Sequence, residues 1–319
     1  MRIGRRRFLL ASGAALAAAC APRVDLPPTA APPAGSAPDE LAEISRAILS
    51  GGPPPDGIPP VERPAYVSVA DAAKQWNDDA IVDAFTIDGQ PRAYPRFITV
   101  WHEIVNENAG GKPISVTYCP LTGSTLIFSG ELADGRTTTF GTSGMLYNSN
   151  LVMYDRATKS MWPQLLGIAV RGERKGERLQ EIGGAVTTTF GRWKAKFPSG
   201  VVLSKDTGHA RAYGTWPYGD YDTASGVIFP VRVTDDRFHQ KKVVVGVRVN
   251  GAALAIPKDE FAERREAKIE VGGRELVAQY DAELDAVRVL DRKTLEPISA
   301  YDVMWFAWYA FNPKTEVLR

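Results

Sequence analysis

The chain has 319 residues, of which 44% are hydrophobic and 24% are charged, and its formal net charge is +1. This mixed, nearly neutral composition is typical of a globular protein and excludes the basic surface that nucleic-acid binding requires. The residues beyond an N-terminal leader and linker suffice for one large core or two modest ones.

The first twenty residues have the pattern of an export signal. Three arginines at 5–7 precede an apolar run over 8–19, which is too short to span a bilayer as a helix. Twin arginines followed by Phe-Leu indicate the Tat pathway. Cys20 follows three alanines, as at a lipoprotein cleavage site, so residues 1–20 are predicted to be a Tat-type lipoprotein signal with lipidation at Cys20. The alternative is a soluble, cleaved form.

A Pro- and Ala-rich segment, residues 21–60, is predicted to be a tether with a short helix at 39–49. It leads to a single domain, residues 61–319, in the periplasm or on the outer face of the cell envelope, attached to the membrane through lipid. Cys119 is then the only thiol of the exported body and has no partner for an internal disulfide. An exported protein that keeps one thiol either buries it or uses it.

An internal repeat suggests the fold. Residues 81–120 align without gaps on 243–282, and the identities fall on turn glycines, strand-ending prolines and a tyrosine. Each copy reads strand–turn–strand–helix–strand. We therefore predict a β-rich α+β fold of two related halves, near 78–165 and 240–312, with an insertion between them.

The first copy carries the candidate chemistry. Residues 113–119 and 124–129 read as two strands joined by a tight corner, with Cys119 at the corner. Pro120 cannot donate to a ladder, so pairing is expected to stop there. The Cys119 side chain is expected to be a presented functional group or, equally, a packed core residue, because free cysteine is commonly buried.

A helix is predicted immediately before this strand. The apolar stripe that predicts it consists of Phe97, Ile98, Trp101, Ile104 and Val105. His102 lies at the border of the stripe, so we expect it to be partly buried and to share one cavity with Cys119. The alternative is a histidine hydrogen-bonded inside the structure. The second copy has Asp281 and Arg264 at the equivalent positions and lacks both groups.

Residues 137–164 are dense in polar side chains, and residues 143–156 are expected to line the wall of the same cavity. The candidate ligand-binding residues there are Asn148, Asn150, Tyr154, Asp155 and Arg156, and the soft sulfur atoms belong to Met145 and Met153. The alternative is a loop whose amides satisfy its own backbone. Further along, 187–197 is predicted to be helical, 213–221 an aromatic loop, and 301–311 a buried, helical core segment.

These motifs resemble the DUF3179 family of exported bacterial and archaeal proteins, over roughly residues 56–313. The likeness is carried by Asp56-Gly57-Ile58-Pro59, Arg92-Ala93-Tyr94-Pro95, Trp101-His102-Glu103-Ile104-Val105-Asn106, Val116-Thr117-Tyr118-Cys119-Pro120-Leu121, Leu146-Tyr147-Asn148-Ser149-Asn150-Leu151, Leu203-Ser204-Lys205-Asp206-Thr207-Gly208 and Phe306-Ala307-Trp308-Tyr309-Ala310-Phe311. The resemblance implies a family of unknown function and no reaction. Many relatives carry a second cysteine where this chain has Thr122, so a dithiol mechanism is not available here.

Three hypotheses follow. The leading one is a soft-metal site, in which Cys119 and His102 bind copper with help from Met145, Met153 or His209. The second is a metal-free, cysteine-dependent enzyme, in which His102 favours the Cys119 thiolate. The third is a non-catalytic lipoprotein that binds a small molecule or serves as a scaffold. The sequence does not decide whether the protein is an enzyme, and it does not determine the oligomeric state.

Overall fold

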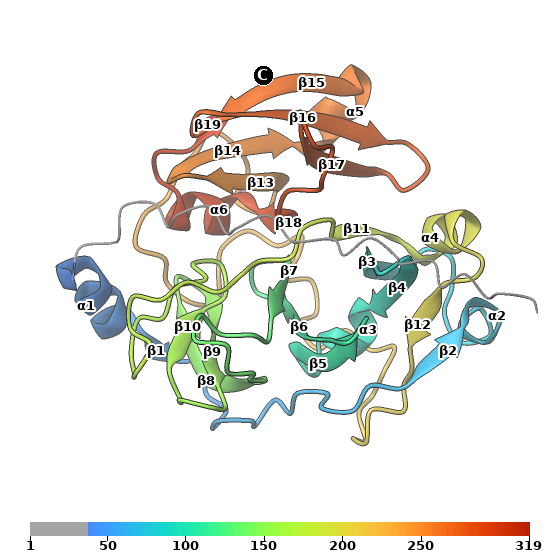
Figure 1. The fold of residues 1–319 in the computed structure, drawn as a ribbon, viewed down its shortest axis with the longest axis horizontal. Helices are drawn as coiled ribbons and strands as arrows, with labels where there is room; N and C mark the ends of the chain where they lie inside the picture. The colour runs from blue at the N-terminus through green and yellow to red at the C-terminus, as the bar shows by residue number, and fades with distance from the viewer. Residues whose placement is uncertain (1–37) are drawn as a thin grey trace, which may run out of the picture. The chain divides into compact units, whose positions relative to one another are not determined.

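The computed structural model describes residues 38–319, which form nineteen short strands and six short helices (Figure 1). The strands form five small sheets that are arranged as a five-bladed β-propeller. The predicted α+β fold of two related halves is therefore wrong. None of the helices in this part of the chain is long and apolar enough to cross a membrane.

Residues 49–203 supply three of the sheets. The sheet that carries Cys119, here called the thiol sheet, consists of β5 (Ile104–Ala109), β6 (Lys112–Cys119) and β7 (Ser124–Ser129). The second sheet has the order β1 (Leu49–Ser50), β8 (Phe140–Tyr147), β9 (Asn150–Asp155) and β10 (Met161–Pro163). The third has the order β11 (Val186–Thr189), β3 (Ile81–Ile87), β4 (Gln90–Pro95), β12 (Val201–Leu203) and β2 (Tyr66–Ser68).

Residues 243–317 supply the other two sheets. One has the order β18 (Ala300–Met304), β13 (Val243–Val249), β14 (Ala252–Pro257) and β19 (Glu316–Val317). The other, here called the counterpart sheet, consists of β15 (Glu266–Val271), β16 (Arg274–Asp281) and β17 (Ala286–Asp291). The helices are α1 (Pro38–Ala47), α2 (Val69–Ala72), α3 (Arg96–Thr99), α4 (Phe190–Lys196), α5 (Lys258–Arg264) and α6 (Trp305–Phe311).

The sequence repeat relates individual sheets rather than halves of one α+β unit. In the alignment of the two copies, the hairpin of β3 and β4 corresponds to that of β13 and β14. The thiol sheet corresponds to the counterpart sheet. The sheet of β8, β9 and β10 follows β7, whereas residues 292–299, which follow β17, form no named strand. The likeness is thus local, and the five-sheet arrangement could not be read from it.

Hairpin turns explain why the repeated segments stood out in the sequence. Asp88 and Gly89 join β3 to β4 with φ of 47° and 75°, and Asn250 and Gly251 join β13 to β14 with φ of 48° and 82°. Two consecutive residues with positive φ define the type I′ turn, which matches the twist of a hairpin and favours Asx-Gly. The predicted turns at these positions are present.

The prediction that His102 lies in a helix is wrong. Helix α3 ends at Thr99, and Ile104 and Val105 belong to strand β5. Glu103, between them, has φ of 58°, so the chain leaves the helical conformation before the strand begins. The apolar stripe misled because a short helix and an adjoining β-branched strand bury residues at the same spacing as one continuous helix.

Two other predicted helices begin as strands. The segment 187–197 divides into β11 and α4, and the segment 301–311 divides into β18 and α6. The latter is buried as predicted, with Trp305 and Trp308 inaccessible to solvent. In both segments the strand pairs with a neighbour that lies far away in the sequence, so tertiary pairing overrides local propensity.

The described part of the predicted tether is packed on the fold. Helix α1 buries Leu41 and Ile44 against Val152 of β9, and β1 pairs with β8. The folded unit therefore begins earlier than residue 61. The predicted signal and Cys20 lie outside the described residues.

Candidate functional site

Cys119 is placed by the corner between β6 and β7. It is the last residue of β6 and pairs with Ser124, and Gly123 supplies the positive φ of 63° that lets the chain turn back. The Thr122 amide donates to the Cys119 carbonyl at 3.3 Å, which closes the corner. Only 1% of Cys119 is exposed, so the thiol is enclosed by other parts of the fold.

The sulfur atom of Cys119 lies against the hairpin of β8 and β9. It accepts the Leu151 amide at 3.4 Å, and its own proton points to the Ser149 carbonyl at 3.9 Å. Burial and, next, the charge of Glu103 raise the pKa of Cys119 to about 11, against hydrogen bonds from Thr122 and Leu151 that favour the thiolate. The thiol is therefore protonated at neutral pH.

Glu103 is a buried acidic residue whose charge contributes to the raised pKa of this thiol. Its carboxyl makes no hydrogen bond to any other described residue, and only 8% of the residue is exposed. Burial raises the pKa of Glu103 to about 8, because the charged form loses its hydration. Glu103 and Cys119 are thus two buried weak acids, both protonated at pH 7.

Two tyrosines face this pair. Burial raises the pKa of both Tyr218 and Tyr221, and the charge of Cys119 contributes to each shift. The charge of Glu103 also raises the pKa of Tyr218. The Tyr221 hydroxyl donates to the Leu121 carbonyl at 2.9 Å, directly beside the Cys119 corner. We call Cys119, Glu103, Tyr218 and Tyr221 the thiol site.

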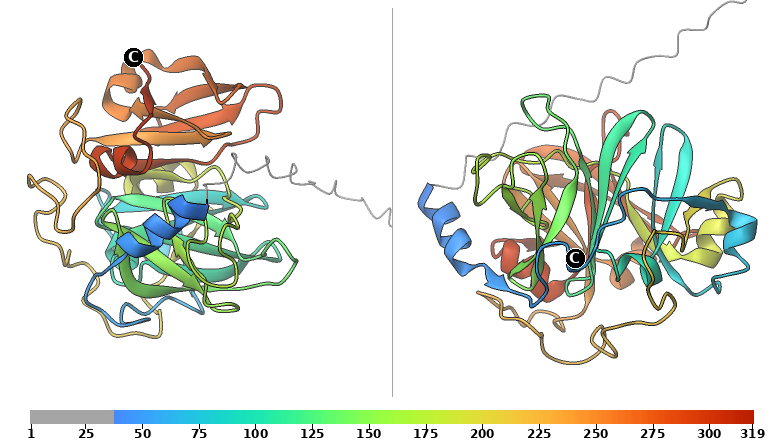
Figure 2. Two further views of the ribbon diagram at one scale, coloured as in Figure 1. Left: turned by 90° about the vertical axis from the view of Figure 1, so that its left-hand side faces the viewer. Right: turned by 90° about the horizontal axis from the view of Figure 1, so that it is seen from below.

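The tyrosines belong to a long connection that covers the thiol site. Residues 204–242, between β12 and β13, contain no helix or strand (Figures 1 and 2). Apolar side chains of this connection, including Val227, Phe229 and Phe238, pack on the core cluster that contains Cys119. Connections of this length without secondary structure are uncommon in compact domains and usually carry function.

His102 is held by other groups than Cys119. Its Nδ1 donates to the Pro59 carbonyl at 2.7 Å, and its Nε2 accepts the Tyr213 hydroxyl at 2.5 Å. Tyr213 in turn lies 2.5 Å from the Thr207 hydroxyl. The residue is fully buried, and burial lowers the pKa of His102 to about 4. His102 is therefore neutral at pH 7 and joins the segment around Pro59 to the covering connection.

The predicted copper ligands are spread over different clusters. Met153 is buried in the same core cluster as Cys119, whereas Met145 packs in the cluster around helix α1. The ring of His209 lies 5.5 Å from that of His102. Within residues 38–319, no group of three or more His, Cys, Asp and Glu side chains is placed to hold a metal ion. Cys119, Met153 and Met304 are the sulfur-containing residues buried in the core cluster of Cys119.

The two asparagines predicted to bind a ligand hold the fold beside the thiol. Asn150 donates to the Thr122 hydroxyl at 3.1 Å and to the Gln164 side-chain oxygen at 2.8 Å. Asn148 donates to the Ala310 carbonyl at 3.1 Å. Asn150 is thus one hydrogen bond away from the corner that carries Cys119.

Tyr154, Asp155 and Arg156 also contact the protein itself. The Tyr154 hydroxyl and the Arg156 guanidinium both donate to the Asp56 carboxylate, at 2.6 and 3.0 Å. Asp155 accepts the Trp162 indole N–H at 3.0 Å. These three residues therefore tie the N-terminal segment to β9 and β10, apart from the thiol site.

Glu103 is the residue that the sequence reasoning did not select. It stands in the Trp101–Asn106 motif, but the predicted helix directed attention to its neighbour His102. The available signal was the position of Glu103 just before a β-branched pair, where a strand was the alternative. In the structure the two adjacent residues point to different surroundings, because Glu103 adopts a left-handed backbone conformation.

Fold and site define a β-rich protein of five small sheets with one buried thiol and a buried carboxyl whose charge affects it. The family described as "Protein of unknown function (DUF3179)" matches residues 55–315, and the chain belongs to this family. This confirms the resemblance found in the sequence motifs. No curated protein and no solved structure matches the chain.

Proposed function

We propose that the protein is a cysteine-dependent enzyme in which Cys119 is the nucleophile and Glu103 is its proton acceptor. The observations that support this role are the burial of both residues and the effect of the Glu103 charge on the pKa of Cys119. Ionised Glu103 takes the thiol proton, the Cys119 sulfur bonds to an electrophilic carbon of the substrate, and Glu103 returns the proton to the leaving group. This assignment replaces the predicted partner His102, whose Nε2 already accepts the Tyr213 hydroxyl.

The covering connection fits this role. Cys119 is 1% exposed, so a substrate reaches the sulfur only when residues 204–242 move. A closed cover excludes water from a reactive thiol and strengthens electrostatic effects inside the site. The reaction class we propose is acyl transfer or a related covalent substitution at carbon, because it needs no second thiol.

The test is the rate at which iodoacetamide alkylates Cys119 as a function of pH. With Glu103 as proton acceptor, the rate rises through pH of about 8, where Glu103 ionises. Glu103→Gln removes this rise in the alkylation rate. The steeper increase that remains, at higher pH, comes from ionisation of the Cys119 thiol itself. Arg265→Gln, at the equivalent position of the second copy, serves as a control. An unchanged profile in Glu103→Gln, or no alkylation at any pH, contradicts the proposal.

Copper binding is the second candidate, supported by the shared burial of Cys119 and Met153. A thiolate and a thioether in a dry cluster suit Cu(I), which prefers soft ligands. Binding releases the thiol proton, so the affinity falls at low pH. Metal analysis of wild type, Cys119→Ser and Met153→Leu separates the two functions. Full copper stoichiometry in Cys119→Ser contradicts a site on this thiol.

We further propose that the protein is exported by the Tat pathway and anchored by lipid at Cys20, in the periplasm or on the outer face of the cell envelope. The support is the arginine motif at 5–7 and the alanines before Cys20. Cell fractionation of wild type and Cys20→Ala tests the anchor. We expect the variant to leave the membrane fraction, and retention there contradicts lipidation at this residue.

A further inference from the structure

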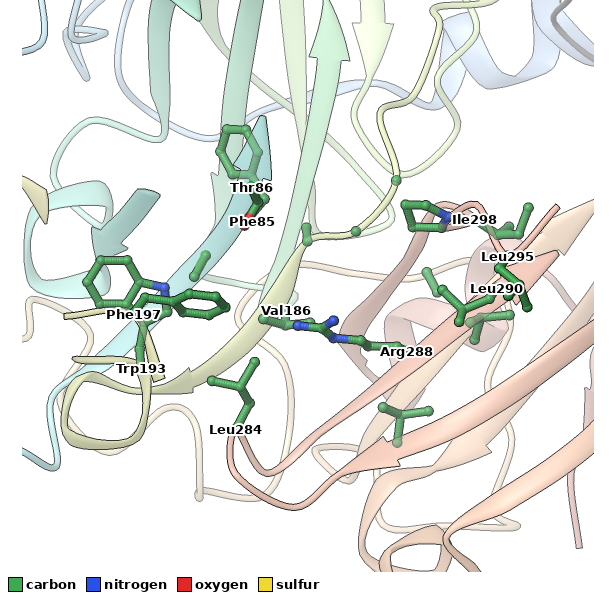
Figure 3. A pocket seen from close by; sticks show the side chains of 18 residues that line it. Phe85, Thr86, Val186, Trp193, Phe197, Leu284, Arg288, Leu290, Leu295 and Ile298 are labelled. Carbon is green, nitrogen blue, oxygen red and sulfur yellow. The ribbon is translucent and has the colours of Figure 1, made fainter. Parts of the chain in front are cut away.

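A pocket of about 310 Å³ lies between β3, β11 and α4 on one side and β17 on the other (Figure 3). It shares no lining residue with the thiol site. Its volume is at the lower end of the roughly 300–1,000 Å³ range of ligand pockets in proteins. We propose that this pocket binds a small amphipathic carboxylate, such as a medium-chain fatty acid.

The apolar wall of the pocket accommodates the body of such a ligand. Phe85 of β3, Trp193 of α4 and Phe197, which follows α4, form one part of it, and Leu284 closes the base (Figure 3). Leu295 lines the pocket on the other side and is 65% exposed, so an apolar side chain stands in water at this edge. A ligand that covers this leucine gains hydrophobic stabilisation.

Gly183 allows the two walls of the pocket to approach each other closely. A Cβ atom added to Gly183 would lie 2.5 Å from the Pro297 carbonyl oxygen, which no side chain tolerates. The segment before β11 therefore approaches the connection between β17 and β18 through bare backbone. The pocket is thus a feature of the packing between the third sheet and the counterpart sheet.

Arg288 supplies the recognition of an anion. Its guanidinium extends from β17 toward Val186 across the pocket (Figure 3). The nearest carboxylate oxygen, that of Asp281, lies 3.6 Å from Nη2, which is longer than a hydrogen bond. Asp281 is already bound by Lys196 at 2.6 Å.

The Arg288 guanidinium therefore makes few interactions with the rest of the protein. The Arg288 Nε is buried and has no hydrogen-bond partner among residues 38–319. The Arg288 side chain is 41% exposed, so its two terminal nitrogens remain accessible and can bind a carboxylate through two parallel N–H donors. One charged head and one apolar body match the single arginine and the aromatic wall.

The experiment measures binding to the purified full-length protein by isothermal titration calorimetry. Sodium decanoate is the probe, and 1-decanol and decyltrimethylammonium carry the same chain with a neutral and a cationic head. We expect decanoate to bind more tightly than both. Arg288→Gln should weaken decanoate binding at least about tenfold, because one charge-assisted contact is lost.

The matched control is Arg292→Gln. Arg292 is exposed, pairs with Glu275 at 2.9 Å and does not line the pocket. We expect decanoate to bind this variant as it binds wild type. Cys119→Ser should also bind normally, so this result is independent of the proposed enzyme function.

A second variant tests the apolar edge. Leu295→Asn removes the exposed leucine and suits the positive φ of 59° at this position, so the fold is preserved. It should weaken decanoate binding severalfold. No binding of decanoate to wild type, equal binding of 1-decanol, or unchanged binding in Arg288→Gln overturns the proposal.

Discussion

The thiol sheet and the counterpart sheet share a backbone and differ in chemistry. Their first two strands pair in the same register, around the turns at Gly110-Gly111 and Gly272-Gly273. Glu103 and Arg265 hold equivalent positions, with φ of 58° and 70°. The backbone carbonyl of each accepts a hydrogen bond from a tyrosine amide at 2.7 Å. The left-handed conformation of Glu103 is therefore a feature of the sheet design and no special strain of the site.

The side chains at these positions have different surroundings. Cys119 and Glu103 are buried, whereas Arg265 is exposed and Asp281, the counterpart of Cys119, forms an ion pair with Lys196 at 2.6 Å. The thiol sheet is covered by residues 204–242 and by the β8–β9 hairpin. Burial by these covering segments, rather than the local backbone, changes the pKa values at the thiol site.

The largest expected effect comes from exchanging the equivalent residues of the two sheets. Cys119→Asp places a carboxyl without a cationic partner in the buried site, and the expected loss of unfolding free energy is about 3–5 kcal/mol. Asp281→Cys loses a partly exposed ion pair and should cost about 1 kcal/mol or less. Urea unfolding of both variants measures the difference. Equal losses would show that the cover does not desolvate the Cys119 position.

Glu103 makes stability fall as the pH rises. Its pKa is about 8 in the folded protein and 4.5 when unperturbed, so the folded state retains a proton that the unfolded chain releases. The stability contributed by the proton is complete below about pH 4.5, declines up to about pH 8 and is then lost. At pH 7 the loss is at most on the order of 3 kcal/mol, at 1.36 kcal/mol for each pKa unit.

Glu103→Gln should therefore raise the unfolding free energy at pH 7 and remove its decline between about pH 6.5 and 8. Chemical unfolding at several pH values measures both effects. Arg265→Gln in the counterpart sheet should change neither, because that residue is exposed. A Glu103→Gln variant with the pH dependence of wild type would contradict the burial of a protonated carboxyl.

His102 has the opposite pH dependence. Its pKa is about 4 in the folded protein against 6.5 in an ordinary histidine, so the unfolded chain takes up a proton first as the pH falls. The stability contributed by neutral His102 is complete above about pH 6.5 and is lost as the pH falls toward 4. By pH 4 this loss is at most about 3 kcal/mol.

His102→Gln should remove this acid-induced loss, because glutamine has the same hydrogen-bonding groups and does not titrate in this range. Thermal unfolding between pH 4 and 7 measures the change. The two contributions have opposite slopes and cancel between about pH 4.5 and 6.5, so wild type should be about equally stable over this range and less stable on either side of it. A stability maximum well above pH 8 would show that these groups do not dominate.

The smallest effect concerns the attachment of the cover. The Lys241 amine donates to the Tyr221 carbonyl at 2.6 Å and lies 3.0 Å from the centre of the Tyr221 ring. Lys241→Met should cost about 1–2 kcal/mol of unfolding free energy and increase the alkylation rate of Cys119. Its neighbour Lys242 pairs with exposed carboxylates, so Lys242→Met should cost about 0.5 kcal/mol.

The comparison of the two sheets also separates the roles of sequence and tertiary structure. Turns, strand ends and the strand that presents Cys119 were predictable, because Asx-Gly, Gly-Gly and Pro impose local backbone conformations. The same local signals could not reveal how the five sheets are arranged or that His102 lies in the turn after a short helix. Both depend on pairing between distant strands, such as β11 with β3 and β18 with β13.

The sequence by itself determined the family, the single thiol and the local design of the two repeated segments. Only the tertiary structure decided that His102 is bonded to Pro59 and Tyr213, and that Glu103 and Cys119 are both buried. The physical reason is that chemistry at this site depends on desolvation, and desolvation is set by residues 204–242 and the β8–β9 hairpin, which approach the thiol sheet in space. A sequence motif determines which chemical groups are present, and the fold determines which of them are desolvated at the same site.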